Sequence, residues 1–137
     1  MTVTTWYLEM TDPGALRPAP DRPGVEVALV DPPDPALNRR LYAEVGSPWR
    51  WVDRLPWDLE RWRAQVAQPE VETWLVLERG ATAGYAELER AGDAVEIAYL
   101  GLLPGFEGRG LGGVLLSAAT RRAWELRPRR VWLHTCS

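Results

Sequence analysis

The segment PGFEGRGLGG, residues 104–113, carries five glycines in ten positions and leads directly into an apolar helical pattern. Glycine lets the backbone approach a ligand closely, because no side chain intervenes. The first amides of a helix are free to donate hydrogen bonds, and the helix dipole favours negative charge at that end. The segment therefore predicts a backbone cradle for an anionic group, with a diphosphate as the natural guest. The alternative is a plain turn between a strand and a helix.

Residues 108–113 also satisfy the G-x-G-x-x-G pattern of dinucleotide-binding proteins. Such a fold needs a complete βαβ unit and an acidic residue about 20 positions further on. The chain holds Val131, Trp132 and Leu133 there, and the preceding strands are expected to be antiparallel. We therefore reject a dinucleotide site. A P-loop is rejected as well, because the Gly-Lys-Ser/Thr sequence is absent.

Composition indicates one cytoplasmic domain, residues 1–137, that acts neither on nucleic acid nor in a membrane. The chain is 46% hydrophobic and 26% charged, as is ordinary for a globular protein. Its net charge of −3 gives no overall attraction to nucleic acid. Cys136 is the single cysteine, which fits a reducing compartment. The first twenty residues lack the pattern of a signal peptide, and no apolar run is long enough to span a membrane.

Hydrophobic periodicity and turn residues predict nine elements. Residues 1–24 are expected to form an N-terminal strand and a proline-rich wrap, and residues 25–137 the core. The mixed, mostly antiparallel central sheet flanked by helices is an α/β (α+β) fold. The predicted strands are 2–10, 25–30, 72–80, 82–92, 94–103 and 130–136, and the predicted helices are 34–46, 55–68 and 110–126.

The stretch LLPGFEGRGLGGVLL (102–116), which follows VEIAYLG (95–101), resembles the acetyl-CoA-binding segment of the GNAT superfamily of N-acetyltransferases. In that family the pattern apolar-x-Pro-x-x-Gln/Arg-Gly-x-Gly-apolar-Gly/Ala joins a central strand to a helix. The order of elements from residue 25 to 136 is similar too. The resemblance implies a GNAT-like fold, acetyl-CoA as co-substrate without a metal, and direct attack of an amine on the thioester. The matching residues are Leu102, Pro104, Gly108, Gly110, Leu111 and Gly112.

The resemblance also implies how the cofactor is held. The backbone of Leu102 and Leu103 is expected to pair with the pantetheine arm like an added strand. Glu107 departs from the family's Gln or Arg, and a carboxylate beside a diphosphate is unfavourable unless it points away. The neighbouring Arg109 is expected to offset it. The backbone amides expected to hold the pyrophosphate are those of Gly108, Arg109, Gly110, Leu111, Gly112 and Gly113.

Acetyl transfer needs a neutral amine, so a base must remove a proton directly or through water. Glu96 lies on the predicted central strand, and in several family members a glutamate at this position is the base. The alternative is a surface glutamate paired with an arginine. Strand alternation places Tyr99 on the opposite face from Glu96, as a core residue.

The segment SPWRWVDRLPWDLERW (47–62) is rich in tryptophan and joins two predicted helices. In the family this loop covers the acceptor, so Trp49 and Trp51 are candidates to bind an aromatic or cationic amine. Packing is the alternative. We interpret His134 and Cys136 as structural, with His134 a minor candidate for lining the acceptor site. A solvated arginine face, from which one side chain could reach the 3′-phosphate of CoA, is expected from Arg121, Arg122, Arg127, Arg129 and Arg130.

Relative to the family, the chain lacks the usual last helix and strands, including a tyrosine that protonates the CoA thiolate. Residues 130–136 would then be an unpaired edge strand. Either a partner chain covers this edge in a homodimer, or the chain is a truncated product of a longer acetyltransferase. A non-catalytic module that binds CoA or a protein partner is the alternative to an enzyme for a small molecule or an amino group.

Overall fold

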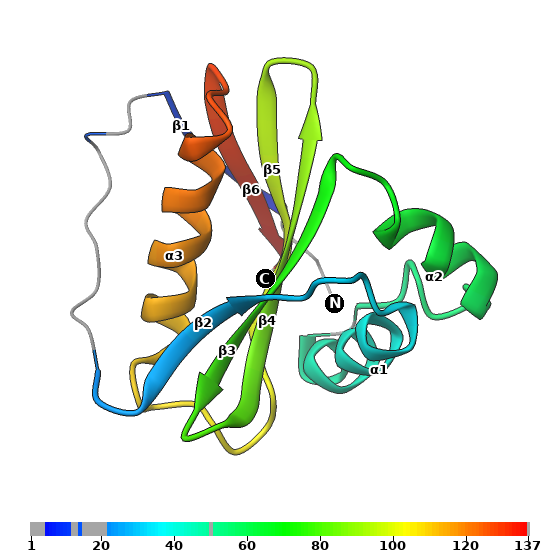
Figure 1. Ribbon diagram of the computed structural model, residues 1–137, viewed down its shortest axis with the longest axis vertical. Helices are drawn as coiled ribbons and strands as arrows, with labels where there is room; N and C mark the ends of the chain where they lie inside the picture. The colour runs from blue at the N-terminus through cyan, green and yellow to red at the C-terminus, as the bar shows by residue number, and fades with distance from the viewer. Residues whose placement is uncertain (1–4, 12–13, 15–21, 50, 137) are drawn as a thin grey trace.

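The computed structural model describes residues 5–11, 14, 22–49 and 51–136, and the predicted order of strands and helices is confirmed (Figure 1). Residues 2–4 of the expected first strand and most of the expected proline-rich wrap lie outside the described residues. The elements are β1 (Thr5–Met10), β2 (Val25–Leu29), α1 (Pro35–Gly46), the short 3₁₀ helix η2 (Ser47–Trp49), α2 (Leu59–Val66), β3 (Val71–Glu78), β4 (Ala81–Ala91), β5 (Ala94–Leu102), α3 (Leu111–Glu125) and β6 (Arg130–Cys136).

Aspartates cap the helices α1 and α2. The Asp34 side chain accepts a hydrogen bond from the Leu37 amide at 3.1 Å, and Asp58 accepts one from the Arg61 amide at 2.9 Å. An N-cap of this kind satisfies an amide that the helix itself leaves free. Because Asp58 is the cap and the residues before it form turns, α2 begins at Leu59 and not at residue 55 as predicted.

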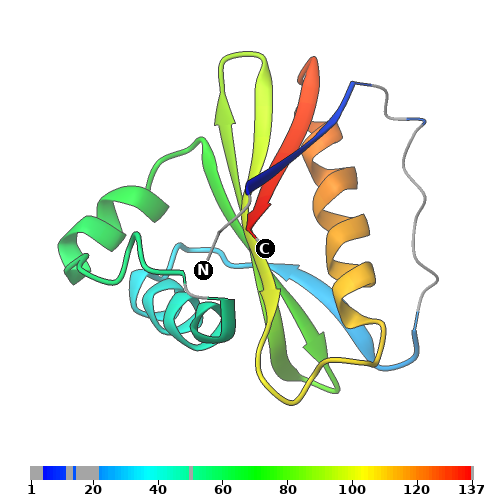
Figure 2. The same ribbon diagram turned by 180° about the vertical axis from the view of Figure 1, so that it is seen from behind.

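The six strands form one sheet in the order β1-β6-β5-β4-β3-β2, in which only β5 and β6 run parallel. Helix α3 connects these two strands and covers one face of the sheet, whereas α1 and α2 lie on the other face (Figures 1 and 2). The predicted meander of β3, β4 and β5 is confirmed by the antiparallel registers.

β6 lies inside the sheet, so the expectation that residues 130–136 form an unpaired edge is wrong. β1 pairs antiparallel with β6 from Thr5↔Cys136 to Met10↔Val131, and β5 pairs on the other side. The first strand of the chain therefore satisfies the backbone groups that the sequence argument left open. This pairing removes the reason for expecting a homodimer through the C-terminal strand.

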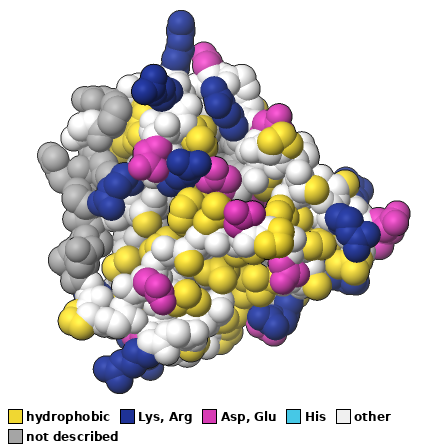
Figure 3. Space-filling model, viewed as in Figure 1, with side chains coloured by type: hydrophobic (Ala, Val, Ile, Leu, Met, Phe, Trp, Pro, Cys, Tyr) yellow, Lys and Arg dark blue, Asp and Glu magenta, His cyan; other side chains and the backbone are white. Residues whose placement is uncertain are grey.

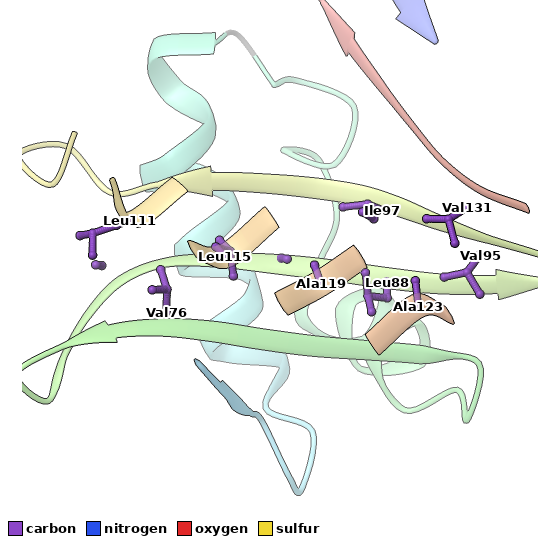
Figure 4. Close-up of a cluster of buried hydrophobic side chains, with 11 residues drawn as sticks. Val76, Leu88, Val95, Ile97, Leu111, Leu115, Ala119, Ala123 and Val131 are labelled. Atoms are coloured by element: carbon purple, nitrogen blue, oxygen red, sulfur yellow. The ribbon is translucent and has the colours of Figure 1, made fainter. Parts of the chain in front are cut away.

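Helix α3 packs on the sheet through one apolar stripe. Leu111, Leu115, Ala119 and Ala123 follow each other at helical spacing and are at most 1% exposed. Figure 4 shows these side chains facing the strands, where the small alanines allow close approach. The buried strand residues in this cluster are Val76, Ala83, Ala86, Leu88, Val95, Ile97 and Val131.

Aromatic side chains fill the space between the other face of the sheet and helices α1 and α2. Tyr42 and Trp62 are 1% exposed and pack with Val66, and partly buried Trp51 and Tyr99 lie against them. On the face that Figure 3 shows, charged side chains of both signs are interspersed.

β5 and β6 separate along their length. Their pairing covers only Ala94–Ile97 and Arg130–Leu133, although β5 continues to Leu102 and β6 to Cys136. We call the unpaired stretch between these strands the splay. The edge of β5 from residue 98 to 102 therefore has no partner in β6, and it leads into the glycine segment.

Candidate active site

The glycine segment enters α3 through backbone conformations that favour glycine. Gly108 has φ of 80°, and Gly110, the N-cap of α3, has φ of 77°. No described side chain caps this helix, in contrast to α1 and α2. The first amides of α3 therefore remain available to an anion, as the sequence argument requires. Leu111 is fully buried, so it can offer only its backbone.

Glu107 and Arg109 do not compensate each other. The Glu107 carboxylate accepts a hydrogen bond from the Gly105 amide at 2.9 Å. Arg109 pairs instead with Glu78 at the end of β3 and lies over the Phe106 ring, 5.7 Å from its centre. The expectation that Arg109 offsets Glu107 is therefore wrong.

Arg22 lies against the glycine segment, and the sequence argument did not identify it. A Cβ atom built on Gly110 would lie 2.4 Å from both Nε and Nη2 of Arg22. The guanidinium group is exposed, and no described carboxylate pairs with it. A cation beside the positive end of a helix is unfavourable unless an anion lies between them. Arg22 is remote in sequence from residues 104–113, so no local pattern could have indicated it.

The two leucines at the end of β5 differ in what their backbones can bind. Leu103 donates its amide to the Ala83 carbonyl at 2.7 Å and accepts from the Phe106 amide at 3.2 Å, so its amide is not free for pantetheine. Backbone groups alternate in direction along a strand. The backbone of Leu102 therefore points away from β4, toward the splay. The Leu102 side chain contributes to the core beneath α3.

A β-bulge changes the relation between Glu96 and Tyr99. Glu87 pairs with Tyr99 and Leu88 pairs with Ile97, so Ala98 is an extra residue in β5. Ile97 belongs to the core beneath α3, whereas Tyr99 packs with the aromatic side chains on the other face. Glu96 alternates with Ile97 and therefore shares the face of Tyr99. The expectation that they lie on opposite faces is wrong, because the bulge interrupts the alternation.

Glu96 is half-buried and lies where β5 is still paired on both sides, opposite Glu89 and Trp132. The six steps of extended chain to Leu102 span about 20 Å. A group held at the glycine segment must therefore extend along the splay to approach Glu96.

The two predicted acceptor tryptophans are not equivalent. Trp49 ends η2, and its side chain lies outside the description. Trp51 is half-buried and packs among rings, with centroid distances of 4.9 Å to Tyr99 and 5.7 Å to Tyr42. A Cβ atom on Gly46 would lie 2.6 Å from the Trp51 ring, so the indole fills a close-fitting site in the aromatic core. The packing interpretation accounts for these contacts.

A buried ion pair lies on the same face and was also missed. Arg54 donates to Glu87 at 2.8 Å, and their exposed fractions are 8% and 0%. Burial lowers the pKa of Arg54, but its hydrogen bond to Glu87 and the Glu87 charge more than offset this, so the net shift is upward. Burial raises the pKa values of the Tyr85 and Tyr99 phenols, which therefore stay protonated at neutral pH. The alternation of β4 could have indicated Glu87, because it shares a face with the core residue Tyr85.

Other parts of the described chain add no metal centre or membrane segment. No group of three His, Cys, Asp or Glu side chains is placed to hold a metal ion among the described residues. Within that same part, no helix combines the length and the apolar character that crossing a bilayer requires. His134 and Cys136 lie in β6, but their side chains are not described. A surface pocket lies between the ends of β2, α2 and β3, away from the glycine segment.

Comparisons with known proteins agree with this geometry. Residues 38–137 match the model of the acetyltransferase (GNAT) family. A GCN5-related N-acetyltransferase from Kribbella flavida is similar in structure (TM-score 0.68, 22% identity), covering 96% of this chain and 49% of its own. A GCN5-related N-acetyltransferase from Sphaerobacter thermophilus has a TM-score of 0.72 and 20% identity, and the match covers 97% of this chain and 42% of that one. A third similar structure is an aminoglycoside acetyltransferase from an uncultured soil metagenomic sample, in complex with sisomicin. Its TM-score is 0.68 at 13% identity, and the match covers 80% of this chain and 76% of that one.

At identities of 22% or less, these structural similarities show a shared fold and no more. The chain spans less than half the length of the first two solved structures. No curated protein sequence gives a significant match.

Proposed function

The chain belongs to the acetyltransferase (GNAT) family, and on that premise we propose that it transfers an acetyl group from acetyl-CoA to a primary amine. The observation that carries the proposal is the uncapped N-terminus of α3, which is entered through Gly108 and Gly110 and lies beside Arg22. A diphosphate fits these residues because it brings negative charge to free amides and a guanidinium group.

In this proposal each element holds a different part of the cofactor. The amides of residues 108–113 and Arg22 would hold the diphosphate, and the outward-facing backbone of Leu102 would hold the pantetheine arm in the splay. The bound thioester supplies the acetyl group. The acceptor is a small molecule or an amino group of a larger one.

Glu96 is the proposed general base. Its carboxylate takes a proton from the acceptor ammonium, directly or through a water molecule, and leaves a nitrogen lone pair. That lone pair would attack the acyl carbon and form the C–N bond, and the C–S bond would break with its electrons on sulfur. The second proton lost from nitrogen would pass to the thiolate, so that the products are the amide and the CoA thiol. No covalent acyl-enzyme is required.

Titration calorimetry with acetyl-CoA tests the cofactor site. Gly108→Ala should weaken binding strongly, because its new methyl group would enter the open space in which we propose that the diphosphate lies. Gly92→Ala is the matched control: Gly92 also has positive φ (60°) and open space, but it lies in the turn between β4 and β5.

Absence of binding by the wild-type protein refutes the proposal. Equal affinity in the two variants refutes the placement of the diphosphate. Binding without product from a panel of amines identifies a non-catalytic CoA-binding module.

A further inference from the structure

Arg54 lies in a cage of three aromatic rings and one carboxylate. Its Cζ atom is 4.5 Å from the ring centre of Tyr99, 4.7 Å from that of Trp57 and 5.4 Å from that of Trp62. The fourth wall is the fully buried Glu87, whose Oε1 atom lies 2.8 Å from Nη1 of Arg54. Aromatic faces and a carboxylate are the surroundings that proteins use to bind organic cations.

The segment between η2 and α2 contacts the sheet through Trp51 and through Arg54. Its neighbours Val52 and Leu55 are 58% and 54% exposed. The Arg54 side chain reaches Glu87, and its amide donates to the Tyr42 hydroxyl at 3.0 Å.

The cage lies beside the splay. Tyr99 is two residues beyond Ile97, the last residue of β5 that pairs with β6, and Glu87 is its partner across the sheet. A cation in the cage would therefore lie next to the expected path of the pantetheine arm.

The polar groups of the cage are incompletely satisfied. The second carboxylate oxygen of Glu87 has a long contact of 3.4 Å with the amide of Gln65. The indole N–H of Trp62 is buried without a partner. A cation can donate only to the Glu87 carboxylate, whose second oxygen has just this one long contact in the described chain, because the Trp62 N–H is itself a donor.

We propose that Glu87, Trp57, Trp62 and Tyr99 form a binding site for an organic ammonium or guanidinium group, and that Arg54 is an intramolecular occupant that a cationic acceptor displaces. The inference rests on the proposed function, since it assigns the acceptor to the class of protonated amines. It also predicts that the Arg54 side chain leaves the cage when an external cation binds there.

Nuclear magnetic resonance of the wild-type protein, labelled with ¹⁵N-arginine, tests the exchange. The Nε–H signal of Arg54 is assigned by its absence in Arg54→Gln. Butylammonium chloride should move this signal saturably toward the positions of exposed arginines, whereas sodium chloride at equal ionic strength should not. The Nε–H signal of Arg122, which donates to Glu72 at 2.9 Å in a partly buried contact between α3 and β3, serves as the internal control and should stay in place.

Calorimetry of Arg54→Ala with butylammonium tests the site itself. We expect millimolar binding that weakens about tenfold or more when Glu87→Gln is added, because a charge-assisted hydrogen bond is lost. Binding to Arg54→Ala with an unmoved wild-type Arg54 signal overturns the proposal, since Arg54 is then a fixed structural residue. Absence of binding to both proteins overturns it as well. If Arg54→Ala does not fold, the wild-type titration alone decides.

Neither titration contains acetyl-CoA. Butylammonium can therefore fail to bind while acetyl-CoA binds, and it can bind while acetyl-CoA does not. The two proposals are tested separately.

Discussion

Replacing Arg54 with methionine tests the energetics of the buried ion pair. The change keeps much of the side-chain volume but leaves Glu87, which is 0% exposed, as a charge without its partner. Breaking one side of a buried pair typically costs about 3–5 kcal/mol. Guanidinium chloride unfolding followed by circular dichroism should show a loss of this size.

Arg122→Met is the matched control. Arg122 also binds a glutamate, Glu72 at 2.8 Å, but its side chain is 33% exposed. Water screens such a pair, so the loss should be about 1 kcal/mol or less. The double variant Arg54→Met/Glu87→Met should recover most of the stability, since no charge remains buried. Equal losses for the two arginine variants would refute the reasoning, because burial would then have no energetic consequence.

Three further predictions concern the site and the surface. Arg22→Ala should weaken CoA binding about tenfold, and the loss of affinity should be larger at low salt, where charges are less screened. Arg39→Ala, which removes an exposed arginine, should leave the affinity unchanged. Calorimetry at two ionic strengths compares the affinities of the two variants. Glu96→Gln should lower turnover strongly with near-normal acetyl-CoA affinity, and unchanged turnover in a steady-state assay excludes it as the base. Arg122 lowers the pKa of Glu72, chiefly by its hydrogen bonds. The pair therefore stabilises the fold at pH values above the unfolded pKa of a glutamate, roughly 4.3. This stabilisation is lost as the pH falls through the lower folded pKa of Glu72. Glu72→Gln should flatten the unfolding free energy against pH in that acidic range.

Local patterns in the sequence predicted most of the elements. Asp34 and Pro35 marked the start of α1, and the glycines between residues 105 and 113 marked the junction of β5 and α3, because caps and φ preferences act within a few residues. The start of α2 was predicted too early, since hydrophobic spacing outweighed the cap at Asp58.

The candidate site could be predicted only where it is local. The glycine segment is contiguous, so its residues could be named in advance. Arg22 and the pair of Arg54 with Glu87 come from separate elements, and only the fold brings them to their partners. Periodicity also could not place Tyr99, because one extra residue in β5 reverses the face that follows it.

The sequence by itself determined which segments are helices and strands, and that a bare backbone precedes α3. Tertiary structure decided that β1 pairs with β6, that β5 bulges at Ala98, and that Glu87 is buried against an arginine. The physical reason is the sequence separation over which each kind of interaction acts. Helix caps, glycine conformations and apolar periods act between near neighbours in the chain, whereas strand partners and buried charges depend on contacts between distant segments, which no local pattern specifies.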